Sequence, residues 1–252
     1  MISKAEIKIL RSLENKKGRE THNLILVEGK RIIKQLLNYK VIPNKVWATQ
    51  TFIYKNTDFI KKLSIETKIY SISHQDIKKT TKTHSPSGII CIVSPAKGSF
   101  KKIARSAVIL DNIADPGNLG TILRTSSWFG VNNILLSEKC VDPYNPKVVR
   151  AAMGAHFNMN IICGTIHKYI ERLKSNNFKI IAADLKTKKT IRKFALKNTK
   201  WALLMGSEAH GLTKSLTEIV DEKIKIPQFG QIESLNVSVA CGIFLYHITK
   251  IK

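Results

Sequence analysis

The sequence predicts an α/β protein with two domains, and three observations carry this prediction. Its 252 residues exceed the roughly 100–200 residues of one typical domain. Short runs rich in Ile, Leu and Val alternate with amphipathic runs along most of the chain, as in strands joined by helices. The segment PAKGSFKKIARS combines Pro, Gly and Ser with four basic side chains, which is typical of a linker. We therefore expect a small α/β domain in residues 1–94, a linker in 95–106 and a second domain in 107–252.

The first domain is expected to open with a helix, because Ser3 and Glu6 form a capping-box pattern before an apolar stripe. The basic polar run KKGRETHN (16–23) is expected to be a loop. The remaining pattern predicts strands at 24–29, 45–49, 68–73 and 88–94, and helices at 29–40, 59–63 and 76–80.

The alternation is clearer in the second domain. It predicts strands at 107–113, 132–138, 157–163, 178–185, 201–206 and 222–227, and helices at 117–130, 145–155, 165–177 and 234–250. Continuous apolar strands between helices indicate a mostly parallel sheet with helices on both faces. Such sheets bind ligands at the carboxyl ends of their strands, so functional residues are expected just after strands.

The charge balance favours an anionic partner. The chain carries 42 Lys and Arg against 18 Asp and Glu, a net charge of +24, and residues 1–105 hold 22 of the basic and 7 of the acidic side chains. Nucleic acid is the first candidate and a membrane surface the second. The alternative is the codon usage of an AT-rich genome, which favours Lys. The first domain is the more basic for its length, so it is the better candidate for holding a polyanion.

Cysteine usage and the termini indicate a cytoplasmic protein. The four cysteines are far apart in sequence and form no CxxC pair, which excludes a zinc knuckle and a dense disulfide framework. We expect them to fill the core, and we expect no metal site. The charged N-terminus does not resemble a signal peptide, and no apolar run reaches the roughly 20 residues of a membrane span.

Three loops that follow predicted strands carry the most distinctive residues. They are DNIADPGNLGTILRT (111–125), LLMGSEAHGL (203–212) and IPQFGQIESLNVSVA (226–240). None matches a dinucleotide fingerprint, and the second departs from a P-loop because Leu212 stands where the phosphate-binding lysine is needed. HExxH, GxSxG and EF-hand patterns are absent from the sequence, which leaves metalloprotease and hydrolase functions without support.

The first loop also predicts the start of a helix. Asp115 is suited to the N-cap and Pro116 to the first helical position. Arg124 then lies two turns into that helix, on the face of Gly117 and Gly120. By spacing alone, Arg124 is equally well read as a surface arginine.

Together and in this order, the three loops resemble the three motifs of the SpoU/TrmH family of the SPOUT superfamily. This family contains AdoMet-dependent RNA ribose 2′-O-methyltransferases. The resemblance spans residues 107–252 and includes the spacer KVVRAAMGAHF (147–157). Residues 1–94 resemble, more weakly, the family's N-terminal substrate-binding domain with a ribosomal-protein-like RNA-binding fold. The resemblance implies a deep trefoil knot, a homodimer and S-adenosyl-L-methionine (AdoMet) as methyl donor. Two departures are Gln228, where Met is common, and Ala152, where Ser is frequent.

The resemblance also assigns site residues. It places five near the reacting hydroxyl: Asn118, Arg124, Glu208, Ser234 and Asn236. Backbone at four positions is implied to hold AdoMet: Leu204, Gly206, Ile226 and Leu235. Arginine stays protonated, so we expect Arg124 to stabilise the developing alkoxide rather than act as a base. The alternative for Glu208 is an acid that only fixes its glycine turn.

RNA contacts are expected at four basic positions: Lys17, Arg19, His22 and Arg150. The first three lie in the expected basic loop, in the region where family members recognise RNA, with Glu28 at the next strand end. A solvated loop and a solvated helix charge are the alternatives.

The sequence thus predicts 2′-O-methylation of a structured RNA, with large-subunit rRNA as the first substrate and tRNA as the second. An alternative from another class is a non-catalytic RNA-binding assembly factor. The presence of all five motif polar residues argues against it. A membrane-surface protein is third, because a basic amphipathic helix with aromatic residues is missing.

Overall fold

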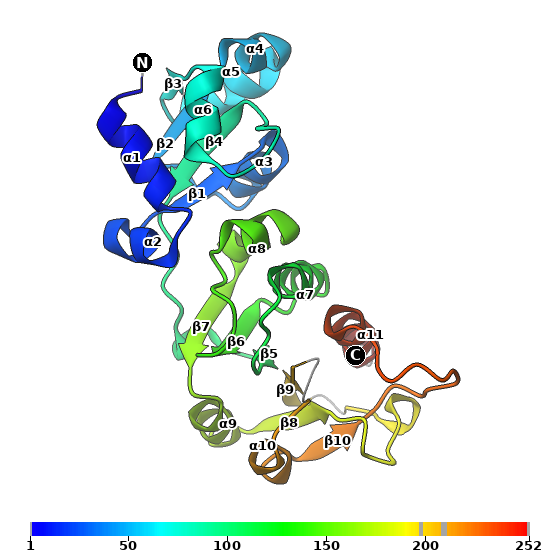
Figure 1. Cartoon of the computed structure of the whole chain (residues 1–252). Coiled ribbons are helices and arrows are strands. Elements are labelled where there is room, and N and C mark those ends of the chain that lie inside the picture. Colours follow the sequence, from blue (N-terminus) through cyan, green and yellow to red (C-terminus); the bar gives the residue numbers. More distant parts are fainter. Residues whose placement is uncertain (1, 197–198, 208–210, 251–252) are drawn as a thin grey trace. The chain divides into compact units, whose positions relative to one another are not determined.

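The computed structural model describes residues 2–196, 199–207 and 211–250, and it divides into two compact units (Figure 1). The N-terminal unit comprises Met1–Ala96 and Asp142–Phe157. The C-terminal unit comprises Lys97–Val141 and Asn158–Lys252. Each unit contains one sheet.

A four-stranded mixed sheet forms the centre of the N-terminal unit. Its strands are β1 (Ile25–Glu28), β2 (Lys45–Ala48), β3 (Ile69–Ser71) and β4 (Ile89–Val93), in the order β1-β4-β2-β3. β4 pairs antiparallel with β1 and β2, and β2 pairs parallel with β3. Side chains alternate between two cores, as a strand requires: Ile25 and Val27 enter one, and Leu26 enters the other. All four expected strands are confirmed.

Helices cover both faces of this sheet. They are α1 (Lys4–Ser12), α2 (Lys16–His22), α3 (Lys30–Asn38), α4 (Gln50–Lys55), α5 (Thr57–Glu66), α6 (His74–Thr80) and α8 (Pro146–Ala151). The capping box that begins α1 is confirmed, because Ser3 and Glu6 exchange both hydrogen bonds, of 2.8 and 3.2 Å. A lysine, Lys45, pairs with Glu6 and helps to lower the pKa of that carboxyl to about 2.

The loop expected at 16–23 is wrong, because these residues form α2. An added Cβ at Gly18 would lie 2.0 Å from the carbonyl oxygen of Ser12, so the backbone of α2 packs directly on the end of α1. The sequence of α2 contains no apolar stripe, and for that reason it resembled a loop. The residue that α2 buries is a charged one, Arg19, which is only 7% exposed.

Residues 142–157 belong to the N-terminal unit although they lie between β6 and β7 in sequence. Arg19 pairs with Asp142 and donates a 2.7 Å hydrogen bond to the carbonyl oxygen of Leu13. His156 is 1% exposed and donates from Nε2 to the carbonyl oxygen of Pro143 at 2.7 Å. Burial lowers the pKa of His156 to about 4 despite that hydrogen bond, so the ring is neutral at pH 7. The expected helix 145–155 ends at Ala151, before the left-handed Met153 and Gly154.

The C-terminal unit contains the parallel sheet that the sequence predicts. Its six strands are β5 (Ser106–Leu110), β6 (Asn133–Ser137), β7 (Asn160–Gly164), β8 (Phe178–Ala183), β9 (Lys200–Met205) and β10 (Glu222–Ile224). All pairings are parallel, in the order β10-β8-β9-β5-β6-β7. β5 and β9 are therefore neighbours although almost 90 residues separate them.

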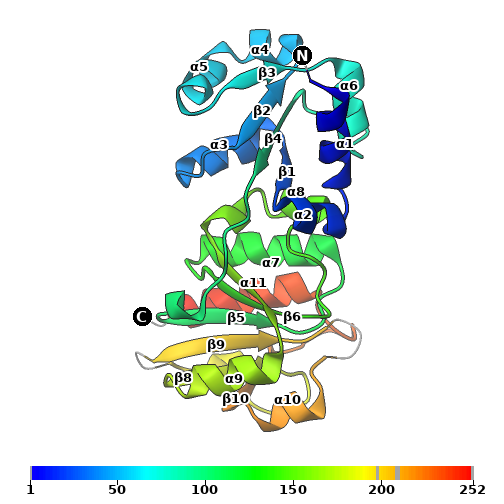
Figure 2. The same cartoon turned by 90° about the vertical axis from the view of Figure 1, so that its left-hand side faces the viewer.

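Helices lie on both faces of this sheet: α7 (Pro116–Trp128), α9 (Ile166–Lys174), α10 (Lys214–Glu218) and α11 (Val237–Lys250). α9 and α10 bury their apolar residues with one face of the strands, including Ile170, Leu173 and Leu216. Figure 2 shows α7 and α11 side by side on the other face. Short 3-10 turns add η1 (Phe100–Lys102), η2 (Ala155–Asn158) and η3 (Ile191–Lys193).

The segment expected to be a linker, 95–106, is anchored to the C-terminal unit from Ser99 onwards. Ser99 exchanges two hydrogen bonds with the side chain of Asn160, of 2.7 and 2.9 Å. Phe100 packs against Tyr169 with ring centroids 5.4 Å apart, and the Arg172 guanidinium lies over its ring. Residues 97–106 therefore form part of the C-terminal unit.

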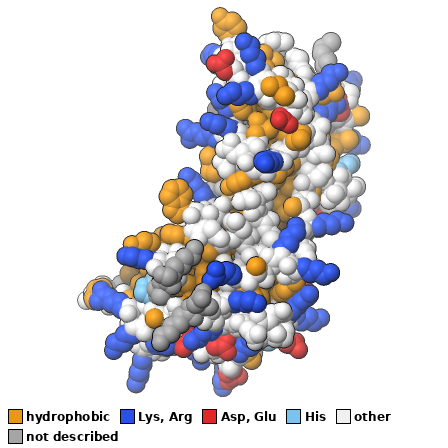
Figure 3. All heavy atoms as spheres, turned by 180° about the vertical axis from the view of Figure 1, so that it is seen from behind, with side chains coloured by type: hydrophobic (Ala, Val, Ile, Leu, Met, Phe, Trp, Pro, Cys, Tyr) orange, Lys and Arg blue, Asp and Glu red, His pale blue; other side chains and the backbone are white. Residues whose placement is uncertain are grey.

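Basic side chains greatly outnumber acidic ones on the face drawn in Figure 3, as the composition leads us to expect. Among the described residues, no helix has the length and apolar character needed to span a bilayer.

We predict that the N-terminal unit loses stability as pH falls from about 6.5 to 4. The pKa of His156 is near 4 when folded and near 6.5 when unfolded, so the unfolded chain binds the extra proton within this window and stability falls with pH. The full shift corresponds to about 3 kcal/mol. Urea unfolding across this pH range measures the loss, which His156→Gln is expected to remove.

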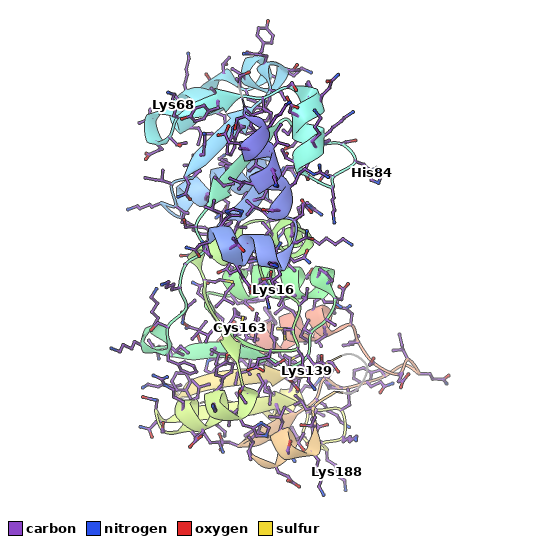
Figure 4. All side chains as sticks on the ribbon, turned by 60° about the vertical axis from the view of Figure 1, so that its left-hand side comes forward. Lys16, Lys68, His84, Lys139, Cys163 and Lys188 are labelled. Carbon is purple, nitrogen blue, oxygen red and sulfur yellow. The ribbon has the colours of Figure 1, made fainter. Side chains whose placement is uncertain are left out.

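His84 provides the matched control, because it is exposed and belongs to the same unit (Figure 4). His84→Gln should keep the pH dependence of the wild type. Equal pH dependence in His156→Gln and wild type would contradict the assignment.

Candidate functional site

The three motifs lie at the carboxyl ends of strands β5, β9 and β10 in the C-terminal unit. β5 leads into the first motif, β9 into the second and β10 into the third. The ends of β5 and β9 are joined directly, because Asp111 N–H donates to the carbonyl oxygen of Met205 at 2.9 Å. The candidate site is therefore where a parallel sheet is expected to bind its ligand.

The first motif is held in position by a capped helix start. Asp115 is the N-cap of α7 and accepts a 2.7 Å hydrogen bond from Asn118 N–H, and Pro116 occupies the first helical turn. Both expectations are confirmed. The cap fixes Asn118 in the first turn of α7.

The loop before α7 depends on residues from the next strand, which the sequence analysis missed. Asn112, in a left-handed conformation, donates from N–H to Ser137 Oγ at 2.9 Å. Cys140 Sγ lies 3.4 Å from Ile113 N and 3.3 Å from the carbonyl oxygen of Leu110. Cys140 is thus part of a backbone network rather than simple core filler. Spacing could not reveal this contact, since β5 and β6 meet only in the sheet.

The four cysteines differ in burial, although all were expected to fill the core. Cys91 and Cys241 are buried, and burial raises the pKa of Cys241 to about 12. Cys163, by contrast, is exposed at the end of β7, so the expectation that it fills the core is wrong.

One side-chain hydrogen bond joins the first and third motifs. Asn236 Nδ2 donates to Asn118 Oδ1 at 2.9 Å. The other atom of the same amide, Asn236 Oδ1, accepts from Ser238 N–H at 2.9 Å and from Ser238 Oγ at 2.6 Å. The side chain of Asn236 thereby caps α11 and also orients Asn118. This explains why the helix expected from Ser234 begins at Val237.

Arg124 projects from the same helix as Asn118. Its side chain is exposed, and it makes no hydrogen bond or ion pair with any described residue. Packing fixes the helix beneath it, because Thr125 Cγ2 lies 3.5 Å from the position of an added Cβ on Gly242 of α11. A guanidinium without a partner is available to an anionic group. Glu208, the predicted acid of the second motif, lies outside the described residues.

The second motif folds back on its own backbone. An added Cβ on Gly206 would lie 2.4 Å from the carbonyl carbon of Gly211, so only glycine permits this approach. Gly211 N–H donates to the carbonyl oxygen of Ser207 at 2.9 Å, and Gly211 is left-handed. Leu204 points into the core, fully buried, so any contact with a ligand comes from its backbone.

The third-motif loop is more open. Ser234 is exposed, Leu235 is 44% exposed and Ile226 is half-buried. Gln228, which departs from the family pattern, has a structural role. Its Nε2 donates to the carbonyl oxygens of Gly230 and Ile232 at 3.0 and 2.6 Å, which closes the loop.

The residues present at these loops fit AdoMet. An added Cβ at Gly211 or Gly230 meets nothing within 4 Å, so backbone is accessible at both loops, and Ile226 and Leu235 add apolar surface. Within the described ranges, no cluster of three or more His, Cys, Asp or Glu could hold a metal ion.

The predicted RNA-binding residues separate into two groups. Lys17 and His22 are exposed on α2. Arg19 is buried against Asp142, so its guanidinium is not available to a phosphate in this conformation. Arg150 is half-buried beside a small cavity that Glu14 and Glu28 also line.

Glu28 organises residues 81–87 instead of presenting a free charge. It accepts hydrogen bonds from the hydroxyls of Thr81 and Thr83 and from Ser87 N–H, at 2.8–2.9 Å. An open hollow of about 590 Å³ elsewhere in the N-terminal unit is lined by residues of α4, α5 and β3, and by none of the motif residues.

Known proteins share this architecture along the whole chain. An AdoMet-bound rRNA methyltransferase from Sinorhizobium meliloti superposes with a TM-score of 0.85 at 25% identity, covering 98% of this chain and 95% of that one. The SpoU methyltransferase AviRb from Streptomyces viridochromogenes has the same fold, with a TM-score of 0.86 at 19% identity over 98% and 96% of the two chains. These matches define an α/β methyltransferase of the SpoU fold.

Sequence comparison leads to the family itself. The SpoU rRNA Methylase family matches residues 105–246, and the MRM3-like substrate binding domain matches residues 4–91. The 23S rRNA (guanosine(2553)-2′-O)-methyltransferase RlmP of Bacillus subtilis is 28% identical, over 96% of this chain and 95% of its own length. An uncharacterized tRNA/rRNA methyltransferase of Synechocystis is 30% identical, over 95% of this chain and 89% of its own length. The chain belongs to the SpoU rRNA methylase family, which confirms the family that its three motifs predict.

We predict that Asn236→Asp separates the two roles of this side chain. Aspartate keeps an oxygen that accepts from Ser238, so α11 should stay capped and the melting temperature should change little. It loses the Nδ2 donor to Asn118, and methyl transfer should fall at least about tenfold, as expected for a loss of roughly 1.4 kcal/mol. Asn236→Ala loses both contacts and should also unfold about 1 kcal/mol more easily. Equal activity in Asn236→Asp and wild type would contradict the role of this hydrogen bond.

We also predict that Gly206→Ala weakens AdoMet binding. The new Cβ collides with the backbone of Gly211 and displaces the second-motif loop. Calorimetric titration should show at least about a tenfold loss of affinity. Gly242→Ala is the matched control, because its Cβ meets Thr125 at an ordinary 3.5 Å. A Gly206→Ala affinity within twofold of this control would contradict the proposed site.

Proposed function

We propose that this protein transfers the methyl group of AdoMet to a ribose 2′-hydroxyl of ribosomal RNA. The observation that carries the proposal is the hydrogen bond between Asn236 and Asn118, in the first turn of the helix that also carries Arg124. This hydrogen bond joins polar residues of the first and third motifs at the end of the sheet where the strands have their carboxyl ends. Family membership adds the chemistry, and the AdoMet-bound relative supports the methyl donor.

The large-subunit rRNA is the favoured substrate. RlmP, whose name specifies 23S rRNA, matches nearly the full length of this chain, and the mouse mitochondrial rRNA methyltransferase 3 matches 94% of it at 26% identity. tRNA is the second candidate, because the Synechocystis relative is named for both RNAs.

The mechanism follows from what the residues offer. AdoMet supplies a methyl group on a sulfonium that needs no metal activation. Backbone at Leu204, Gly206, Ile226 and Leu235 would hold AdoMet, which would supply its methyl group to the ribose oxygen, and the hydroxyl would lose its proton to a substrate phosphate or to water. Arg124 stabilises the developing negative charge on that oxygen. Asn118, held by Asn236, orients the ribose, with Ser234 and Glu208 as further contacts.

Finer features of the fold belong to the same proposal. We infer that residues 1–94 form an RNA-binding domain with a ribosomal-protein-like fold, with 142–157 packed in the same unit, and that the C-terminal unit carries the methyltransferase site and a deep trefoil knot. A homodimer is supported by the apolar face of α11, where Val239, Ile243 and Tyr246 are 38–55% exposed at helical spacing. The high basic charge suits an RNA partner in the cytoplasm. Lys17, His22 and Arg150 are the proposed RNA contacts of the N-terminal unit.

The direct test is methyl transfer to RNA. Purified protein is incubated with labelled AdoMet and unmodified 23S rRNA or tRNA transcripts, and the RNA is digested to nucleosides. A labelled 2′-O-methylnucleoside from 23S rRNA is expected. Label in tRNA alone would contradict 23S rRNA as the substrate and identify tRNA instead. AdoMet binding without label in either RNA would contradict both substrates, and absence of AdoMet binding would favour a non-catalytic RNA-binding factor.

We predict that Arg124→Ala lowers kcat by about 10²–10³-fold, the usual cost of removing one group that stabilises an oxyanion. Arg124→Lys should recover only part of it, because an ammonium cannot reproduce the planar guanidinium. The melting temperature should be unchanged in both, since Arg124 is exposed and has no described partner. Full activity in Arg124→Lys would contradict a planar, two-pronged contact.

A further inference from the structure

We propose that the C-terminal unit has its own surface for the RNA backbone, separate from the N-terminal unit. We call it the β10-edge basic surface. It consists of Lys186, Lys188, Arg192 and Lys193, which follow β8, and Lys223 and Lys225, which lie in and after β10. The inference rests on the proposed function to the extent that the anion is RNA.

The sequence between β8 and β9 is unusually basic. Residues 185–200 contain seven Lys and Arg and no Asp or Glu. Figure 1 shows residues 185–196 of this segment in yellow near the orange β10. Lys186, Lys188, Arg192 and Lys193 are exposed, and Figure 4 places Lys188 at the outer edge of the unit.

Two nearby acids, Glu222 and Asp221, are paired with lysines that do not belong to this surface. Glu222 accepts from Lys179 at 3.0 Å and from Lys189 at 2.7 Å, and these two lysines hold the pKa of its carboxyl below the usual range. Asp221 pairs with Lys174 at 2.8 Å, and Asp184 accepts from Lys186 N–H. The six cations of the surface form no ion pair with any described residue.

The backbone that carries these cations is fixed in place. Ile191 N–H donates to the carbonyl oxygen of Lys225 at 2.8 Å, and Lys225 N–H donates to that of Lys189 at 3.0 Å. Ile191 and Phe194 are buried, and His247 Nε2 donates to the carbonyl oxygen of Phe194 at 3.0 Å. The segment thus extends the edge of the sheet as a rigid ridge, and little backbone entropy is lost when it binds.

This surface is continuous with the third motif. The Arg192 guanidinium lies 5.4 Å from the ring centre of Phe229, which is 84% exposed in the third-motif loop. An arginine stacked on a ring keeps its N–H groups for phosphate, and an exposed aromatic ring can stack an unpaired base. RNA held by the lysines would therefore be directed towards the loop that carries Ser234 and Asn236.

The test compares two double variants of the full chain. Lys188→Gln with Lys193→Gln removes two charges from the β10-edge basic surface. Lys101→Gln with Lys168→Gln removes two exposed charges elsewhere in the same unit. The probe is a 20-nucleotide oligouridylate, because backbone contacts are independent of sequence, and affinity is measured over a series of salt concentrations.

The surface variant should lose about 1.4 from the slope of log K against log salt, since each phosphate contact to single-stranded RNA contributes about 0.7. Its Kd at 0.1 M salt should rise on the order of tenfold, whereas the control variant keeps the wild-type slope. AdoMet affinity and melting temperature should stay unchanged, because neither lysine contacts the motif loops. Cross-linking with 4-thiouridine RNA should label peptides in 185–193 or 223–229.

Two results would overturn the inference. If the surface variant binds like the control while the wild type binds RNA and methylates it, the surface is wrong and the proposed function stands. If the wild type neither binds the oligouridylate nor methylates rRNA, the proposed function fails and the inference fails with it.

Discussion

The candidate site depends on one side chain, Asn236, whose amide serves two helices. Its oxygen accepts from Ser238 and caps α11, and its nitrogen donates to Asn118 in the first turn of α7. The two helices pack side by side on one face of the sheet. A shift of either helix therefore moves the polar group of the other, and the geometry for methyl transfer is linked to the packing of this face.

The loops at the strand ends are also held by specific contacts. Each is closed by its own backbone or by a neighbouring strand: Gly206 against Gly211, Gln228 across its loop, and Asn112 on Ser137. The Arg124 guanidinium, on the same helix as Asn118, is exposed and has no partner among the described residues. The role proposed for Arg124 fits this arrangement, because a paired guanidinium would have to be released before it could stabilise a developing charge.

Elsewhere in the chain, acidic side chains are also held in specific hydrogen bonds and ion pairs. Most acids are committed to specific tasks, such as Glu6 in its capping box, Asp142 with Arg19 and Glu222 with two lysines. With 42 Lys and Arg against 18 Asp and Glu, one-to-one pairing would still leave most basic side chains without an acidic partner. This excess favours long-range attraction of RNA, and the cations that a fixed backbone holds in place are the ones suited to position it.

Sequence patterns alone were enough to predict the parallel sheet, the strands of both sheets and the family, but not that residues 142–157 belong to the N-terminal unit. These features depend on local periodicity and on three motifs that are contiguous in the chain. Local signals also identified Asp115 and Pro116, because a helix start is decided within four residues. They failed for α2, whose stability comes from Arg19 and Asp142, 123 residues apart.

Only the tertiary structure decided which motif residues meet and which basic residues remain available. Asn118 and Asn236 are 118 residues apart and are joined because α7 and α11 pack together. Arg19 resembled Lys17 in sequence, but burial against Asp142 removed it from the surface. Cys140 contacts the backbone of the first-motif loop because β5 and β6 are neighbours in the sheet. Contacts of this kind are set by strand order and helix packing, which no single segment encodes.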